Sequence, residues 1–280
     1  MAGVGKPVPY APSVAHLAKQ TLFEGPLARV ANVTCGAPRS RAGTAEHSHA
    51  GELVLARRGV FVVHRGGGAV VADAATAVLL RPGDEYRVSH PADHGDRCTA
   101  IAFAPAVAEE AMPSVPHVVL RPQTQLRAAL LAARIANGAD PLEAEEGALL
   151  LLGAVADDAG TGAPPAAPNR RVEDVRALLA GDPAAPWRLR DVAAAVHCSP
   201  FHLARQFRAA TGETIARYAT RLRLALALER IAGGEDDLAR LAHDVGFAHH
   251  SHFSARFRAL FSRTPSEVRK ILTARPGEAA

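Results

Sequence analysis

Imidazole, carboxylate and thiol side chains that could bind a metal occur between residues 47 and 98 of the 280-residue chain. His47 and His49 are separated by one residue and would lie on the same face of a strand. With Glu52 they would present two imidazoles and a carboxylate, a donor set suited to a divalent transition metal. Cys98 could complete a zinc-type site with the two histidines, and His90 lies on the same half of the chain. These residues predict a candidate effector or metal site.

An internal repeat in the C-terminal third of the chain indicates a second functional region. Residues 189–207 read LRDVAAAV, a short turn, then SPFHLARQF. Residues 238–257 read LARLAHDV, a turn, then HHSHFSARF. The turn of the second copy is one residue longer, and a small residue in each first helix, Ala193 or Ala242, allows the two helices to approach closely. Each copy therefore predicts a helix-turn-helix unit.

The second helix of each copy combines an apolar face with a polar, basic one. Leu203 with Phe207, and Phe253 with Phe257, are i, i+4 pairs that would anchor the helix to a core. The opposite face suits the major groove of DNA. Residues 215–231 predict a connecting helix of roughly 25 Å. That length could hold two reading helices about one DNA turn, roughly 34 Å, apart.

Charge and cysteine content agree with a polyanion partner and a reducing compartment. From residue 169 onward the chain holds 18 Lys+Arg and 12 Asp+Glu, a net of +6, whereas the preceding residues have a net of −2. A basic domain beside a near-neutral one suggests nucleic acid. Cys35, Cys98 and Cys198 are too few and too scattered for a disulfide framework. No signal peptide or transmembrane helix is evident, so we expect a cytoplasmic protein without a membrane partner.

The order of the predicted elements gives the fold class. Short apolar or alternating runs between turn signals predict a small all-β sandwich or barrel. These runs are Leu27–Cys35, Glu52–Ala56, Val60–Val63, Ala69–Ala72, Ala77–Leu80, Tyr86–Ser89 and Cys98–Phe103.

A helical hairpin and a linker are expected after the strands. Residues 123–155 have helical periodicity with an apolar stripe, which predicts a surface for a homodimer. The alternative is that the hairpin closes the core of the β domain. The stripe comprises Leu126, Leu130, Ile135, Leu149 and Leu152. A stretch rich in Gly, Ala and Pro follows the hairpin and predicts a linker between domains. The residues after this linker are predicted to be helical. The predicted divisions are 1–115 for sensing, 116–157 for the hairpin, 158–169 for the linker and 170–275 for DNA binding.

The C-terminal third resembles the AraC family of transcription regulators. The resemblance covers Arg170 to about Leu272 and depends on the double helix-turn-helix, the connecting helix and a C-terminal signature. Two departures touch the final turn: Ser262 stands where the family usually has Gly, and Val268 where it has an aromatic residue. The signature residues are Ser199, His202, Leu203, Arg205, Phe207, Gly212, Tyr218, Arg221, Val245, Gly246, Phe247, Ser251, Phe253, Phe257, Thr264, Pro265, Ser266, Glu267 and Arg269.

The resemblance also implies which residues contact DNA. Arg205 is the best candidate for a bidentate guanine contact, and Arg208, Arg256 and Arg258 suit phosphates. His202 and His252 are expected to pack between helices rather than to read bases. The base-contacting positions fall on Phe201, Ala204 and Arg205 in the first copy, and on His250, Ser251, Ser254 and Ala255 in the second.

The first half resembles cupins, which the AraC family places ahead of its DNA-binding part. The segment from Glu46 to Gly59 is similar to the first cupin motif, and in metal-binding cupins its His-x-His and Glu supply ligands. The second motif lacks the His of the fourth ligand, so a divalent metal and a metal-free organic effector both stay open. Arg81, Tyr86 and Arg87 could contact an anionic effector, although ordinary hairpin surface charges explain them equally well.

The sequence as a whole therefore predicts an α+β multidomain regulator: an N-terminal cupin-like β-barrel with a helical hairpin, and an all-α double helix-turn-helix. Expected partners are double-stranded DNA, a small-molecule or metal effector, a second copy and RNA polymerase. We expect no enzymatic activity. One alternative is a cupin metalloenzyme with an appended DNA-binding part, and another is a nucleoid-type architectural protein.

Overall fold

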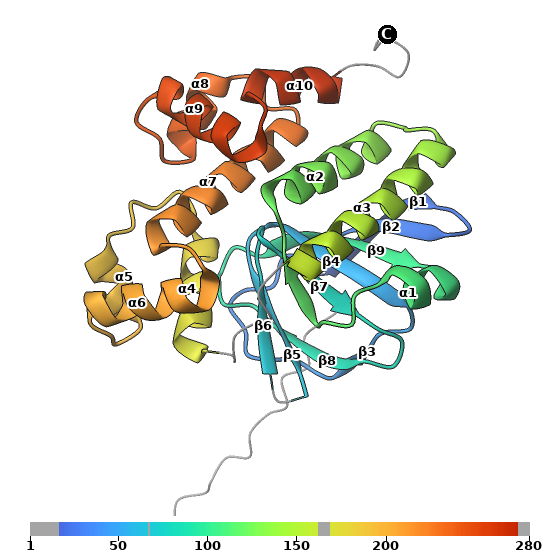
Figure 1. Ribbon diagram of the computed structural model, residues 1–280, viewed down its shortest axis with the longest axis horizontal. Coiled ribbons are helices and arrows are strands. Elements are labelled where there is room, and N and C mark those ends of the chain that lie inside the picture. The colour runs from blue at the N-terminus through green and yellow to red at the C-terminus, as the bar shows by residue number, and fades with distance from the viewer. Residues whose placement is uncertain (1–16, 67, 162–168, 274–280) are drawn as a thin grey trace, which may run out of the picture.

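The computed structural model describes residues 17–66, 68–161 and 169–273 of the chain. Two β-sheets and a helical hairpin form the N-terminal half, and helices alone form the C-terminal part (Figure 1). Residues 1–16, which begin the predicted sensing domain, Gly67, and most of the predicted linker, 162–168, lie outside the described residues. Among the described helices, none is both long and apolar enough to cross a membrane.

All seven predicted strands are present, and they divide between two antiparallel sheets. Two further strands, β1 and β10, were not expected from the sequence because they lack a clear apolar alternation, and the strand expected at His47 and His49 is only the two-residue β3. In spatial order the larger sheet contains β1 (Leu17–Glu24), β2 (Ala28–Cys35), β9 (Asp96–Phe103), β4 (Gly51–Arg58), β7 (Thr76–Leu80) and β10 (His117–Val119). The smaller sheet contains β3 (Glu46–His47), β8 (Glu85–Ser89), β5 (Phe61–Arg65) and β6 (Gly68–Ala72).

The larger sheet is covered on both faces, which explains its continuous apolar runs. Alternate side chains of β7 enter different cores: Leu79 faces the helical hairpin, whereas Val78 and Leu80 face the smaller sheet. No hydrogen-bonded ladder joins the two sheets within the described ranges. Of the two architectures that the strand pattern predicts, sandwich or barrel, the described residues form the two-sheet sandwich, and the β-barrel given in the overall prediction is not found among them.

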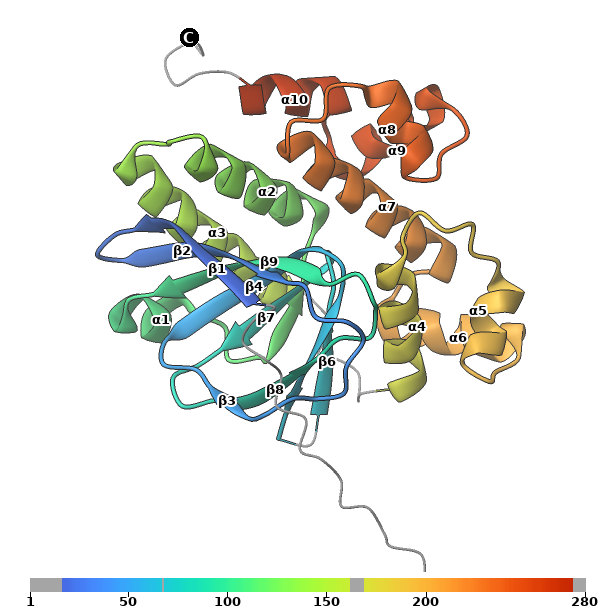
Figure 2. The same ribbon diagram turned by 180° about the vertical axis from the view of Figure 1, so that it is seen from behind.

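The hairpin consists of α2 (Pro122–Ala136) and α3 (Pro141–Thr161), and a short helix that the sequence analysis missed, α1 (Pro105–Ala111), precedes it. One face of the hairpin packs on the larger sheet through Ile135 and Leu152. The other face of α2 packs on the C-terminal helices through Leu126 and Leu130. Figures 1 and 2 both show α2 between the larger sheet and helices α8–α10.

The apolar stripe of the hairpin was expected to form a homodimer surface. That expectation is wrong, because other parts of the same chain cover the stripe. Leu126, Ile135 and Leu152 are 7%, 7% and 1% exposed, and Leu130 and Leu149 pack at the edges of the two cores. The hairpin also extends further than expected. Asp158, placed in the linker by its sequence, is buried in α3 and accepts a hydrogen bond from the Arg121 backbone N–H at 2.7 Å.

The C-terminal part contains α4 (Arg170–Gly181), α5 (Leu189–Ala195), α6 (Pro200–Thr211), α7 (Ile215–Ala232), α8 (Leu238–Asp244), α9 (His250–Phe261) and α10 (Pro265–Thr273). Two apolar cores hold these helices. One joins α4, α5, α6 and the first half of α7, and Val60 and Val71 of the sandwich belong to it. The other joins the end of α7 with α8, α9, α10 and α2. The N-terminal half therefore contributes to both cores.

Candidate nucleic-acid interface

The first helix-turn-helix consists of α5 and α6, as the repeat predicts. The Ser199 hydroxyl accepts a hydrogen bond from the backbone N–H of His202 at 3.3 Å, and Pro200 occupies the first turn, so the start of α6 is fixed by local sequence. Leu203 and Phe207 are fully buried and attach α6 to the core. The i, i+4 anchor expected from the sequence is confirmed.

The second helix-turn-helix consists of α8 and α9. Asp237 caps α8 by accepting hydrogen bonds from two backbone N–H groups at 3.1 and 2.9 Å. Phe253, Phe257 and Phe261 are buried and their rings contact one another along α9 at steep angles, with ring centroids 5.7 and 4.7 Å apart. At the end of α9, Ser262 adopts φ +60°, the left-handed conformation for which a glycine is preferred. The backbone thus follows the usual helix ending although the residue departs from the family pattern.

Helix α7 keeps the two units at a fixed separation. It has 18 residues, which corresponds to roughly 27 Å at 1.5 Å per residue. Arg223 of α7 donates to the carbonyl oxygens of Pro183 and Ala185 at 2.9 and 2.6 Å, and to that of Gly246 at 3.4 Å. The first two lie before α5 and the third lies in the turn after α8. One guanidinium therefore ties both units to the connecting helix.

The predicted DNA-contacting side chains lie on the solvent-facing side of α6 and α9. Phe201 is 73% exposed, and the Arg205 guanidinium lies 5.7 Å from the centre of its ring. This distance is a cation–π contact between two exposed side chains one helical turn apart. Ala204 and Ser254 are half-buried, and the exposed positions are Arg208, His250, Ser251, Ala255, Arg256 and Arg258.

The two histidines expected to pack between helices are instead exposed. His202 is solvent-facing on α6. His252 is exposed too, although its ring lies 5.6 Å from that of Phe247 and its Nε2 accepts from Arg256 at 3.1 Å. The expectation was wrong because the apolar positions of α9 are already filled by phenylalanines. Both histidines join the candidate interface.

The N-terminal candidate residues are not brought together. β3 ends at His47, so His49 lies beyond the strand, and Glu52 belongs to the other sheet. His47 is exposed and pairs with Glu85 at 3.8 Å. The expected metal set of His47, His49 and Glu52 is therefore wrong, because the chain leaves β3 after His47 and enters β4 of the other sheet at Gly51.

The residues proposed for an anionic effector have structural partners. Arg81 donates to the carbonyl oxygens of Met112 and Pro113 at 3.0 and 2.9 Å. The hydroxyl of Tyr86 donates to Glu46 at 3.1 Å, and burial together with Glu46 raises the pKa of Tyr86. Arg87 is exposed on β8. These contacts favour the hairpin-surface explanation.

Within the described residues, one group of three metal-type side chains does converge: Cys35, His90 and Asp96. Of these three residues only His90 was predicted from the sequence as a site residue, and Cys35 and Asp96 were not. Cys98 is buried nearby, outside this group, and burial raises the pKa of its thiol to about 12. Only the cross-strand pairing of β2 with β9 reveals the group, and spacing along the chain gives no signal for it.

A buried polar cluster that the sequence analysis also missed joins the two halves of the chain. Arg176 of α4 donates to the carboxylate of Asp73 and to the carbonyl oxygen of Val71, both at 3.1 Å. Its Nε donates to the Tyr218 hydroxyl at 3.0 Å, and that hydroxyl donates to Asp73. Burial opposes the charge of Arg176, but Asp73 and Glu173 hold its pKa above the usual value. Burial raises the pKa of Tyr218 so that it stays a donor.

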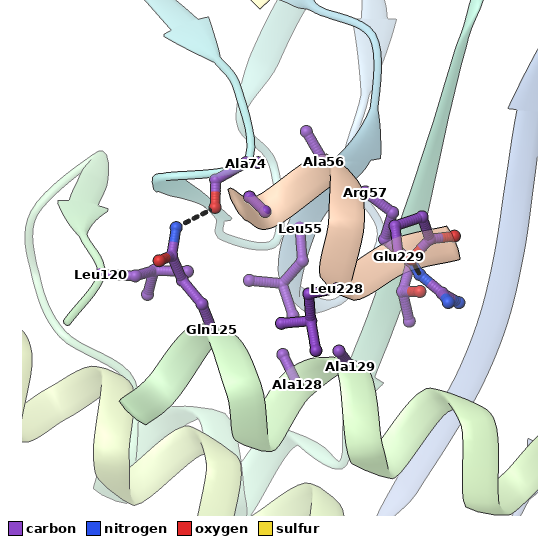
Figure 3. A pocket seen from close by; sticks show the side chains of 12 residues that line it. Leu55, Ala56, Arg57, Ala74, Leu120, Gln125, Ala128, Ala129, Leu228 and Glu229 are labelled. Atoms are coloured by element: carbon purple, nitrogen blue, oxygen red, sulfur yellow. Dashed lines mark hydrogen bonds and ion pairs between the residues drawn. The ribbon is translucent and has the colours of Figure 1, made fainter. Parts of the chain in front are cut away.

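A second contact between the halves surrounds a small cavity of about 50 Å³ between β4, α2 and α7 (Figure 3). Its lining is largely apolar and includes Leu55 of β4 and Leu228 of α7. At one side Arg57 of β4 donates to Glu229 of α7 at 2.8 Å, with both side chains largely buried. The space is enough for one or two water molecules and too small for an organic effector.

Comparison with known proteins agrees with this geometry. The helix-turn-helix domain family matches residues 192–271. An AraC-like transcription regulator of Streptomyces antibioticus is 33% identical over 93 residues, which are 33% of this chain and 31% of that protein. The transcriptional activator RhaS of Pectobacterium carotovorum is 42% identical over 67 residues, 24% of each chain. The C-terminal part is an AraC-type helix-turn-helix domain.

The AraC-type domain is the shared part, and the chain spans only about a third or less of the length of these relatives. Among solved structures, ToxT of Vibrio cholerae is 12% identical with a TM-score of 0.39, covering 92% of this chain and 99% of its own. A cupin barrel domain protein of Salinispora arenicola is 20% identical with a TM-score of 0.29, covering 39% of this chain and 95% of its own.

Proposed function

We propose that the chain is a sequence-specific DNA-binding transcription regulator whose N-terminal β domain controls its AraC-type domain. The observation that carries this proposal is the pair of exposed second helices, α6 and α9, held by one connecting helix. Both are anchored by buried phenylalanines and present their polar faces to solvent. Recognition helices that enter successive major grooves need this arrangement.

The exposed residues divide by the kind of DNA contact that they suit. Arg205 can reach a guanine edge with two hydrogen bonds, and the exposed ring of Phe201 suits a thymine methyl group. Arg208, Arg256 and Arg258 suit phosphates, which position the domain without reading sequence. On α9, the small side chains of Ser251 and Ala255 allow close approach to the bases.

Control by the N-terminal domain is supported by its contacts with both helix-turn-helix units. The Asp73–Arg176–Tyr218 cluster attaches α4 and α7, which share a core with the first unit, to the turn between β6 and β7. Helix α2 attaches the second unit through Leu126. A change in the β domain that altered either contact would change how the two units are presented to DNA, which is the coupling that an effector requires.

A homodimer and an interaction with RNA polymerase belong to the same proposal. Helix α3 leaves Leu142 and Leu150 74% and 55% exposed, and a second copy could cover them. Light scattering on the full chain should give a dimer, and Leu142→Glu with Leu150→Glu should give a folded monomer. A monomeric wild type at tens of micromolar would contradict the homodimer. In vitro transcription with purified polymerase would test the second partner.

The experiment that tests the function is selection of binding sites from random duplex DNA by the purified full-length chain. We expect an enriched sequence motif and, for that motif, binding that is specific against competitor DNA. Equal binding to all sequences with the same salt dependence would instead favour an architectural protein. Arg205→Ala combined with Ser251→Ala provides a variant that should lose the motif but keep non-specific affinity.

A further inference from the structure

Cys35, His90 and Asp96 come from three different segments and meet at one end of the sandwich. Cys35 is the last residue of β2, His90 follows β8, and Asp96 begins β9. One possible ligand atom from each lies within 4.8 Å of the other two. The side chains of His90 and Asp96 are 13% and 5% exposed, so the group is almost withdrawn from water.

The backbone holds these residues in place. Cys35 and Asp96 are direct partners in the β2–β9 ladder, so their side chains share a face. Gly95 has φ +67°, and a Cβ at this position would overlap the carbonyl oxygen of Cys35. The loop can therefore pack against Cys35 only with glycine here. His90 is paired with Ser40 by two backbone hydrogen bonds of 2.9 and 3.2 Å.

The group leaves one buried carboxylate oxygen without a hydrogen-bond partner. Nδ1 of His90 lies 3.1 Å from the Ser40 hydroxyl, which fixes the ring. Its Nε2 lies 3.2 Å from Oδ2 of Asp96, yet that buried oxygen has no hydrogen-bond partner. In a tetrahedral zinc site, ligands at about 2.0 Å from the metal lie roughly 3.3 Å apart. The 3.2 Å between Nε2 of His90 and Oδ2 of Asp96 matches that ligand–ligand distance.

We propose that Cys35, His90 and Asp96 bind a divalent cation of the zinc class. One thiolate, one imidazole and one carboxylate suit Zn²⁺ and late first-row cations better than Mg²⁺ or Ca²⁺. Binding would displace the thiol proton to solvent, and a water molecule would complete the four ligands. Ser40, on the far nitrogen of His90, is the positioning residue. Cys98 lies outside the group and is not a ligand in this proposal.

The same loop contacts the AraC-type domain, which gives the cation a route to DNA binding. His94 is hydrogen-bonded to the carbonyl oxygen of Gly181 at the end of α4, and Ala92 packs in the core of the first helix-turn-helix unit. Because the cation would fix both ends of the 90–96 segment, it would change the surface on which α4 docks. This part of the inference, that the cation is the effector, rests on the proposed function.

The first measurement is Co²⁺ binding to the full-length chain after treatment with EDTA, followed by optical spectroscopy. We expect one Co²⁺ per chain with a thiolate-to-cobalt charge-transfer band, which Zn²⁺ abolishes by competition. Cys35→Ser should remove the band, and His90→Gln should weaken binding by about tenfold or more. His47→Gln and Cys98→Ser are the matched controls and should bind as the wild type does.

Absence of the thiolate band in the wild type would overturn the site, as would equal losses in His47→Gln and His90→Gln. Circular dichroism of each variant checks that a loss is not unfolding, and Ser40→Ala gives a milder change that leaves all three ligands present. The second measurement is affinity for the selected DNA with and without Zn²⁺. A change of severalfold that His90→Gln abolishes supports the effector role. Zn²⁺ binding with unchanged DNA affinity overturns that role alone, and failure to select any DNA overturns the proposed function alone.

Discussion

The buried cluster between the two halves gives the most direct test of how they are coupled. Tyr218 is 3% exposed and Asp73 is fully buried, and the tyrosine hydroxyl both accepts from Arg176 and donates to Asp73. Tyr218→Phe removes both hydrogen bonds and leaves a buried guanidinium N–H without its acceptor. Leaving such a group unsatisfied costs about 1–3 kcal/mol, so we expect the chain to lose stability by that amount.

Asp73→Asn should cost more, because it replaces a carboxylate that accepts from Arg176 at 3.1 Å by an amide whose N–H₂ group faces donors. Breaking a buried ion pair costs about 3–5 kcal/mol. In the variant that carries both Tyr218→Phe and Asp73→Asn, the two losses of stability should not add. The difference between the measured loss and the sum of the single losses should be about 0.5–3 kcal/mol, the range found for residues in one network.

Urea unfolding followed by two signals provides the assay. The single tryptophan, Trp187, lies between α4 and α5, so its fluorescence reports the AraC-type domain, while far-UV circular dichroism reports the whole chain. Tyr86→Phe is the matched control, since that hydroxyl is bonded to the exposed Glu46 at 3.1 Å, and it should cost well under about 1 kcal/mol. Additive losses, or equal effects of Tyr86→Phe and Tyr218→Phe, would refute the reasoning.

Four further outcomes follow from the structure. Arg205→Ala should weaken binding to the selected site by about 1–3 kcal/mol at one base pair; in competition assays, an equal loss on every sequence would show that this arginine contacts only phosphate. Phe253→Ala should destabilise the second helix-turn-helix by about 3–5 kcal/mol, because the side chain is fully buried; an unchanged melting temperature would contradict this. Ser262→Gly should raise stability by about 1 kcal/mol, since a left-handed conformation costs a non-glycine residue roughly that much, and a lower melting temperature would argue against the strain at φ +60°. Burial, with Arg176 and Arg65 nearby, lowers the pKa of His117 in the folded chain. Because the unfolded chain then binds more protons, stability should fall as the pH drops through the ordinary histidine pKa of about 6.5 toward the lowered one. Melting curves of His117→Gln should show a smaller fall in stability over that pH window.

The sequence alone determined the features that depend on local periodicity and capping. Seven strands, the two helix-turn-helix units and the connecting helix follow from where apolar residues recur along the chain. Ser199 and Pro200 set the start of α6 because a cap acts within one turn. The burial of Phe207 and Phe253 follows from their helical spacing for the same reason.

Only the tertiary structure decided which of these elements meet. Cys35 faces Asp96 because β2 pairs with β9 in one register, and a slip of one residue would turn one of them to the other face. Asp73 and Tyr218 are separated by 145 residues and share a hydrogen bond because of how α7 docks on the sandwich. The apolar stripe of the hairpin looked like a partner surface because periodicity shows that a face is apolar but not what covers it. In this chain, the larger sheet covers one side and the second helix-turn-helix covers the other.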